Sequence, residues 1–260
     1  MPSKWVQQCP GYATYRWHED GSIEVDGEGF WTYDLGGKQA ENIRTFWNKY
    51  GKMFLATAGE LGLPVAWVVG IVFVESRGDE WGCSPCEPKT CPALYPNCGG
   101  GVAKDGKHYV CCAYGLMQVI EVNAKHYGFK SGADLLGNPT DSIRVGCKIY
   151  KSNLNASKGD PLVAVRRYNG CSKTTCVGGR ITNCNPSCPF GVGGQNGYAL
   201  KFAKSVNTFL ALDLGDPSGY DPARIEESRA SMGALGWAAI IGGSLALSYL
   251  AAKHWPRGGR

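Results

Sequence analysis

The sequence lacks several features that would point to common functions. It has no low-complexity tract and no repeat at a solenoid period, which argues against a solenoid architecture. Its basic residues are scattered and its formal net charge is +5, whereas a nucleic-acid binder usually carries a dense stripe of lysine and arginine. We therefore expect no nucleic-acid partner. A weakly basic surface fits an anionic polymer such as a cell wall, or an anionic membrane.

The N-terminus also lacks the apolar run of a cleavable signal peptide, since it reads MPSKWVQQCPGYATYRW. The chain nevertheless has 12 cysteines, an even number, in segments rich in glycine and proline. This favours disulfides and an oxidising environment, so we expect another export route or a delivery machinery. The cysteines are Cys9, Cys83, Cys86, Cys91, Cys98, Cys111, Cys112, Cys147, Cys171, Cys176, Cys184 and Cys188.

Structural zinc and free thiols are the alternatives to disulfides. Cys83 and Cys86 have the spacing of half a zinc knuckle. However, no matching CxxC pair follows, and His108 is the only histidine in that segment. We favour disulfides and predict neither a metal site nor a cofactor.

Residues 1–37 predict a short non-helical N-terminal extension, with a hairpin around the sequence DGEG. From Lys38 onward, apolar residues recur every three or four positions, as an amphipathic helix requires. Pro64 suits the start of a second helix. The following segment, PVAWVVGIVFV, is apolar on every face and favours a buried helix over a buried strand.

Helical periodicity returns between residues 116 and 165 and between 198 and 209. Residues 81–112 and 171–195 are rich in cysteine without periodicity, which predicts two cross-linked loops inserted between helices. The sequence therefore predicts a mainly α-helical domain over residues 38–212.

Beyond a linker at residues 213–232, the uncharged segment Gly233–Ala252 predicts a transmembrane helix. About twenty residues in a helix cross roughly 30 Å of hydrocarbon. Trp237, Tyr249 and Trp255 lie near its ends, as interfacial aromatic residues often do. The basic tail at 253–260 places the globular part outside the cytoplasm by the positive-inside rule. A buried core helix is the alternative.

Glu75 directly follows the apolar segment at 64–74. A poorly solvated carboxyl group has a raised pKa, because burial disfavours its charged form. A carboxylic acid that is protonated near neutral pH can cleave a glycosidic bond by general-acid catalysis. The alternative is an ordinary glutamate at a helix end that reaches water or caps a neighbour.

Three ordered motifs, ES at 75–76, YGLMQV at 114–119 and RRYNG at 166–170, resemble those of the lysozyme-like soluble lytic transglycosylase family. The segment NPTDSIRVGCKIYKSNL at 138–154 resembles the family's helix after the GLMQ segment, and Tyr198 resembles a tyrosine near its final helix. The resemblance covers residues 38–210 and implies a lysozyme-like α+β fold that is mainly helical.

The resemblance implies that Glu75 protonates the glycosidic oxygen between N-acetylmuramic acid (MurNAc) and N-acetylglucosamine (GlcNAc) in peptidoglycan. Glu75 would then act as a base toward the C6 hydroxyl, which gives a 1,6-anhydro sugar. Ser76 would bind near the sugar or orient the acid, and Tyr168 would hydrogen-bond to the Glu75 carboxyl. Arg167 stands where the family usually has alanine and would contact substrate carboxylates or peptide. The remaining substrate-binding residues would be Gly115, Met117, Gln118, Asn169 and Tyr198.

The number of carboxylates separates two reactions. Ordinary glycosidases hold two carboxyl groups at a defined separation. Glu75 has no motif partner, because four nearby acids fall outside the matched motifs: Asp79, Glu80, Glu87 and Glu121. A lone acid suits an intramolecular reaction in which the substrate supplies its own nucleophile. We therefore favour a transglycosylase, which is a lyase, over a lysozyme-type hydrolase.

The missing signal peptide and the predicted anchor favour a wall-penetrating enzyme of a bacteriophage virion, in contact with the membrane and with other virion proteins. A conjugation or secretion system is the second context, and a structural membrane protein that merely binds glycan is a rival of another class. We further expect the two cysteine-rich loops to form the rims of the substrate cleft.

Overall fold

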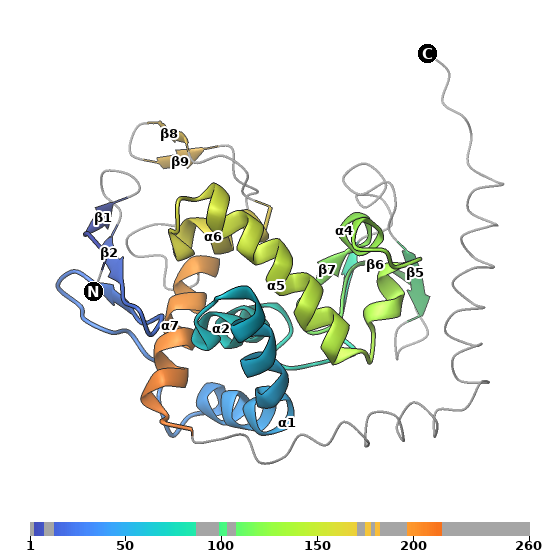
Figure 1. Cartoon of the computed structure of the whole chain (residues 1–260), viewed down its shortest axis with the longest axis horizontal. Coiled ribbons are helices and arrows are strands. Elements are labelled where there is room, and N and C mark those ends of the chain that lie inside the picture. Colours follow the sequence, from blue (N-terminus) through green and yellow to red (C-terminus); the bar gives the residue numbers. More distant parts are fainter. Residues whose placement is uncertain are drawn as a thin grey trace. The chain divides into compact units, whose positions relative to one another are not determined.

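The computed structural model describes residues 3–7, 13–86, 99–102, 108–170, 175–177, 180–182 and 197–214 (Figure 1). The chain divides into two compact units. Of the described residues, unit 1 comprises those up to Asp79 and those from Ile143 onward, and unit 2 comprises those from Glu80 to Ser142. The described part is mostly helical, in agreement with the predicted mainly α-helical fold. Its α-helices are α1 (Lys38–Leu61), α2 (Val65–Glu75), α4 (Glu121–His126), α5 (Pro139–Ala156), α6 (Pro161–Tyr168) and α7 (Tyr198–Ala211).

Helix α1 begins at Lys38, where the apolar periodicity begins in the sequence. One face carries the buried side chains, among them Ile43, Phe46, Tyr50 and Phe54. The helix ends at Gly62, which adopts the left-handed conformation with φ 58°. The predicted amphipathic helix is therefore confirmed.

Helix α2 settles the choice between a helix and a strand for the apolar segment. It is buried along Ala66–Phe73, as a helix that is apolar on every face requires. Gly70 faces α7: a Cβ atom at this position would lie 2.7 Å from Val206 and 3.0 Å from Phe202. The missing side chain lets the two helices pack against each other at short range (Figure 1).

The N-terminal segment forms a three-stranded antiparallel sheet in the order β1 (Val6–Gln7), β2 (Thr14–Trp17), β3 (Ile23–Val25). The predicted hairpin around DGEG is reduced to a single antiparallel bridge between Val25 and Gly29. Residues that follow Gly29 do not pair as a strand, because their backbone bonds to α7 instead: the Trp31 carbonyl accepts from Asn207 at 3.0 Å, and the Tyr33 amide donates to Thr208 at 2.8 Å.

The same segment is tied to the helices of unit 1 by buried polar contacts. The Asn207 side chain bonds both the amide and the carbonyl of Ile23, at 2.9 and 2.8 Å. The Trp67 indole N–H donates to the Gly21 carbonyl at 2.8 Å. The described residues around Gly21, Ile23, Trp31 and Tyr33 thus take part in the packing of the helical unit.

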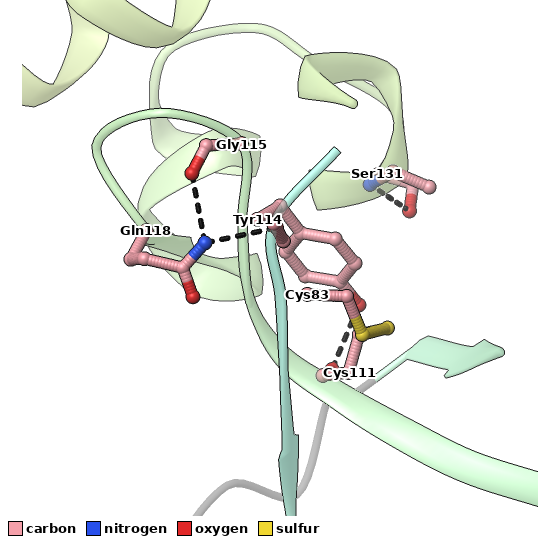
Figure 2. The surroundings of a disulfide bond; sticks show 8 residues. Cys83, Cys111, Tyr114, Gly115, Gln118 and Ser131 are labelled. Carbon is pink, nitrogen blue, oxygen red and sulfur yellow. Dashed lines mark hydrogen bonds between the residues drawn. A yellow bond between two sulfur atoms is a disulfide. The ribbon is translucent and has the colours of Figure 1, made fainter. Parts of the chain in front are cut away.

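Unit 2 differs from the sequence prediction, since the described parts of residues 81–112 contain paired strands. Strands β4 (Cys83–Cys86), β6 (His108–Tyr114) and β5 (Gly99–Val102) form an antiparallel sheet in that order, and β7 (Val119–Ile120) pairs with β6. A disulfide joins Cys83 to Cys111 across β4 and β6 (Figure 2). Backbone hydrogen bonds between the strands and the Cys83–Cys111 disulfide hold this sheet together. The strands therefore do not need an alternating apolar face, and the sequence pattern does not predict them.

The second cysteine-rich loop contains a short antiparallel pair, β8 (Thr175–Val177) and β9 (Arg180–Thr182). Cys147 is a buried free thiol in α5, so it is an exception to the expectation of disulfides. Whether the two loops border a substrate cleft stays a prediction.

The predicted linker at 213–232, transmembrane helix at 233–252 and basic tail at 253–260 lie outside the described residues, apart from residues 213 and 214. Within the described part of the chain, no helix combines the length and the apolar character needed to span a bilayer.

The hydroxyl of Tyr15 donates a buried hydrogen bond of 2.7 Å to Asp160 Oδ2. Asp160 Oδ1 caps α6 by accepting from the amides of Leu162 and Val163, at 2.9 and 3.0 Å. Tyr15→Phe leaves this buried carboxylate with one donor fewer, so we expect the free energy of unfolding to fall by about 1–3 kcal/mol.

Urea unfolding of the purified protein measures this loss. Tyr127→Phe is the matched control, because the half-buried Tyr127 hydroxyl makes no hydrogen bond among the described residues. Equal stability of the two variants would show that the Tyr15 bond contributes nothing.

Candidate active site

Glu75 is the last residue of α2, and a tight turn fixes the backbone that follows it. The amides of Ser76 and Arg77 both donate to the Val72 carbonyl at 3.0 Å. Arg77 and Gly78 then adopt positive φ angles of 55° and 86°. A Cβ at position 78 would lie 2.7 Å from Phe46, so glycine allows this turn to lie directly on α1.

Ser76 belongs to the turn itself. Its hydroxyl donates to the Val72 carbonyl at 3.3 Å and accepts from the Gly78 amide at 3.2 Å. Ser76 therefore stabilises the backbone turn that follows Glu75. Its role in orienting the acid stays a prediction. Direct binding of a sugar by Ser76 stays a prediction.

Tyr198, the first residue of α7, donates a short hydrogen bond from its hydroxyl to Glu75 Oε1. The two residues are 123 positions apart in the sequence and meet because α2 packs on α7. The sequence assigned such a bond to Tyr168, for which it stays a prediction. Tyr198 was expected only among the substrate-binding residues.

Burial raises the pKa of the Glu75 carboxyl to about 8, and the hydrogen bond from Tyr198 opposes this by lowering it. The residue retains part of its surface exposure, yet the desolvation of its carboxyl decides the direction of the shift. Glu75 is therefore protonated at neutral pH. A carboxyl group that is protonated at neutral pH, on a residue that is only half-buried, has the properties of a general acid.

The RRYNG motif lies at the C-terminal end of α6, also in unit 1. Burial raises the pKa of Asp160, and the charge of Arg166, which is 2 % exposed, is among the smaller effects that lower it. Arg167, Tyr168 and Asn169 are half-buried, and the Asn169 amide donates to the Val165 carbonyl at 3.1 Å as the helix ends. Substrate contacts by these three residues stay predictions.

Gly115, Met117 and Gln118 form one turn of unit 2. A Cβ at Gly115 would lie 2.7 Å from the Leu135 carbonyl oxygen, and its φ of 69° also favours glycine. Met117 is fully buried. The Gln118 side-chain amide donates to the carbonyls of Gly82 and Gly115, both at 2.8 Å (Figure 2). These contacts shape the turn, and a role in binding substrate stays a prediction.

The four acids that lie outside the matched motifs differ in their surroundings. Glu121 is 7 % exposed, accepts a hydrogen bond from the Gly132 amide at 2.6 Å and forms an ion pair with Lys125 at 3.1 Å. These contacts stabilise unit 2. Asp79 is exposed and Glu80 is half-buried, whereas Glu87 lies outside the described residues.

No cluster of three or more histidine, cysteine or acidic residues in the described part of the chain is arranged to hold a metal ion. The disulfide with Cys111 also occupies the Cys83 sulfur, which removes it from the zinc site considered above.

Tyr198→Phe tests the balance that sets the Glu75 pKa. Because the Tyr198 hydrogen bond stabilises the carboxylate, its removal shifts the pKa of Glu75 above 8. A pH titration of the glutamate carboxyl ¹³C resonances measures the shift, with Glu75→Gln used to assign the signal.

Tyr168→Phe is the comparison variant for this titration. An upward shift in Tyr168→Phe, with none in Tyr198→Phe, would give the orienting role to Tyr168 instead.

Comparison with known protein families gives a match that covers α2, α4, α5, α6 and the second part of α1. Residues 52–176 match the family described as Transglycosylase SLT domain. The match contains Glu75, Ser76 and both later motifs, and it ends before Tyr198. No curated protein matches the chain. The matched residues are similar to the transglycosylase domain of that family.

Proposed function

We propose that this protein is a lytic transglycosylase that cleaves the β-1,4 bond between MurNAc and GlcNAc and leaves a 1,6-anhydroMurNAc end. The observation that carries the proposal is the Glu75 carboxyl, which burial keeps protonated at neutral pH while Tyr198 holds one of its oxygens. The SLT-domain match supports the same activity from the sequence.

The reaction follows from the properties of this single acid. Glu75 donates its proton to the glycosidic oxygen as the bond from MurNAc C1 to that oxygen breaks, and GlcNAc leaves with a free 4-hydroxyl. The C6 hydroxyl of the same MurNAc attacks C1, and its proton passes to the Glu75 carboxylate. The acid is regenerated, and no water is consumed.

The Tyr198 hydrogen bond has a distinct role at each stage. It lowers the Glu75 pKa against the effect of burial, so it stabilises the carboxylate that exists between the two proton transfers. Burial in turn restores the protonated form for the next cycle. One carboxyl group therefore acts as acid and then as base.

The contacts of the two other acids that are buried in the described part of the chain support transfer rather than hydrolysis. Hydrolysis by a glycosidase needs a second carboxylate to activate water or to form a covalent intermediate. Asp160 is bound to Tyr15 and to the start of α6, and Glu121 is bound to Gly132 and Lys125. Both are committed to structural contacts.

Glu75→Gln removes the transferable proton and keeps the shape of the side chain. We expect the release of muropeptides from purified peptidoglycan to fall by about 10²–10⁴-fold, the usual contribution of a general acid. Mass spectrometry of the products measures both the rate and the end group. The control is Glu60→Gln, which changes an exposed glutamate of α1 and should retain full activity.

The products of the wild type distinguish the rival reactions. Anhydro ends support the transglycosylase, and reducing MurNAc ends would assign a lysozyme-type hydrolase. No digestion by a folded wild type would leave only glycan binding.

We also propose that Gly233–Ala252 tethers the enzyme to a membrane with the domain at residues 38–212 outside the cytoplasm, on or within a bacteriophage virion. The uncharged run and the basic tail after it support the anchor. The Cys83–Cys111 disulfide supports an oxidising location. In a virion, the enzyme would open the wall locally and contact other virion proteins. A conjugation or secretion system is the second context.

The anchor is tested by flotation with lipid vesicles. We expect the full chain to float with the vesicles and a chain truncated after Met232 to stay in the dense fraction with its activity on peptidoglycan intact. Flotation of the truncated chain would place the membrane contact elsewhere.

A further inference from the structure

The segment that precedes α1 presents aromatic side chains from a fixed backbone. Trp31 and Tyr33 are held through their backbone by Asn207 and Thr208, which are 3 % and 0 % exposed. The Tyr33 ring packs on Phe73 of α2 with 5.4 Å between centroids. The Trp31 indole N–H donates to Glu28 at 3.1 Å. Both rings are therefore placed with little conformational freedom.

These rings retain solvent contact. Trp31 and Tyr33 are half-buried, and the neighbouring Phe30 is 51 % exposed. Aromatic side chains gathered at a surface mark a contact for a ligand or partner more often than isolated ones do. A pre-positioned pair of rings offers apolar faces to the C–H groups of a sugar or to an acetyl methyl group.

Two cations accompany the rings. The Lys204 ammonium of α7 lies 5.9 Å from the ring centroids of both Trp31 and Tyr33. The charge of Arg77 acts on the Tyr33 hydroxyl. Within the described ranges, neither cation forms an ion pair, and the nearby Glu28 is bound to the Trp31 indole. Their charge is available to an anion of a ligand.

The group contacts the same two helices that carry the acid and its tyrosine, because the Tyr33 ring packs on Phe73 of α2 and Lys204 belongs to α7. Phe73, whose ring contacts that of Tyr33, lies two residues before Glu75, and Arg77 lies two residues after Glu75. Lys204 is six residues after Tyr198 on α7, which is about 9 Å along the helix axis. Trp31, Tyr33 and Lys204 all fall outside residues 52–176, so the SLT-domain match does not account for them.

We propose that Trp31, Tyr33, Arg77 and Lys204 form an auxiliary substrate subsite for the junction of sugar and stem peptide. The aromatic rings contact the sugar and its acyl groups, and the two cations bind a carboxylate of the peptide. This subsite rests on the proposed function, because a peptide-bearing glycan strand is the substrate assumed. Continuity with α2 and α7 and the matching charge favour this occupant over a lipid surface.

Lys204→Met removes the charge and keeps the unbranched side chain. The substrates are peptidoglycan strands with stem peptides and the same strands whose peptide carboxylates are converted to methyl amides. We expect KM on the peptide-bearing strands to rise about fivefold, the effect of one partly exposed charge contact, with kcat unchanged. On the amidated strands, which lack the peptide carboxylates, the variant should match the wild type.

Lys49→Met is the matched control, since Lys49 also lies over an aromatic ring, at 4.8 Å from the centroid of Tyr50 on α1. It should leave KM unchanged on both substrates. A second variant, Trp31→Ala, should raise KM on both, because its ring contacts the sugar.

The subsite is overturned if Lys204→Met behaves as Lys49→Met does, or if it weakens both substrates equally. It is also overturned if the change abolishes binding to anionic lipid vesicles and leaves the glycan kinetics intact. Calorimetric binding of peptide-bearing oligomers to Glu75→Gln, with and without Lys204→Met, tests the subsite independently of turnover. Failure of the proposed reaction is thus distinguished from failure of the subsite.

Discussion

The close packing of α2 against α7 is the contact on which the candidate site depends. Gly70 makes it possible, because any side chain there would meet Val206 at 2.7 Å and the ring of Phe202 at 3.0 Å. Protein interiors are packed too densely to absorb such an overlap without a shift of the backbone. The same helix pair brings the Tyr198 hydroxyl to the Glu75 carboxyl. Packing in the middle of α2 therefore determines the chemistry at its end.

Two opposing effects act on Glu75, and the proposed reaction uses both. Desolvation alone would stabilise the neutral acid and make its return from the carboxylate very favourable, but it would also make proton donation difficult. The Tyr198 hydrogen bond favours the carboxylate. A pKa of about 8 is the result, close to the pH at which a group can both give and recover a proton efficiently.

Sequence patterns predicted those parts of the structure that are governed by helical periodicity. The stripe of buried residues in α1 and the all-apolar α2 were readable because burial of a helix face imposes a period on the sequence. The raised pKa of Glu75 also followed from its place after an apolar run. The strands β4 to β6 were not predicted, because ladder hydrogen bonds and the Cys83–Cys111 disulfide hold them without an alternating apolar face.

Hydrogen-bond partners that are distant in the sequence could not be predicted either. Nothing in the residues around Tyr198 identifies a carboxyl 123 positions away as its hydrogen-bond acceptor. The hairpin around DGEG is shorter than predicted for a similar reason, since the residues after Gly29 bond to Asn207 and Thr208 of α7 rather than to another strand. Local alternation does not reveal which distant element will satisfy a backbone group.

The dependence of the N-terminal segment on α7 links it to the site. Strands of two to four residues are too short to be stable alone, so their order must come from the helices beneath them. Asn207 supplies three of the bonds that fix the segment, to both backbone groups of Ile23 and to the carbonyl of Trp31. Tyr198 lies on the same helix. A single element thus orients the acid at one end and positions the aromatic rings along its length, which is why we assign those rings to the substrate of that acid.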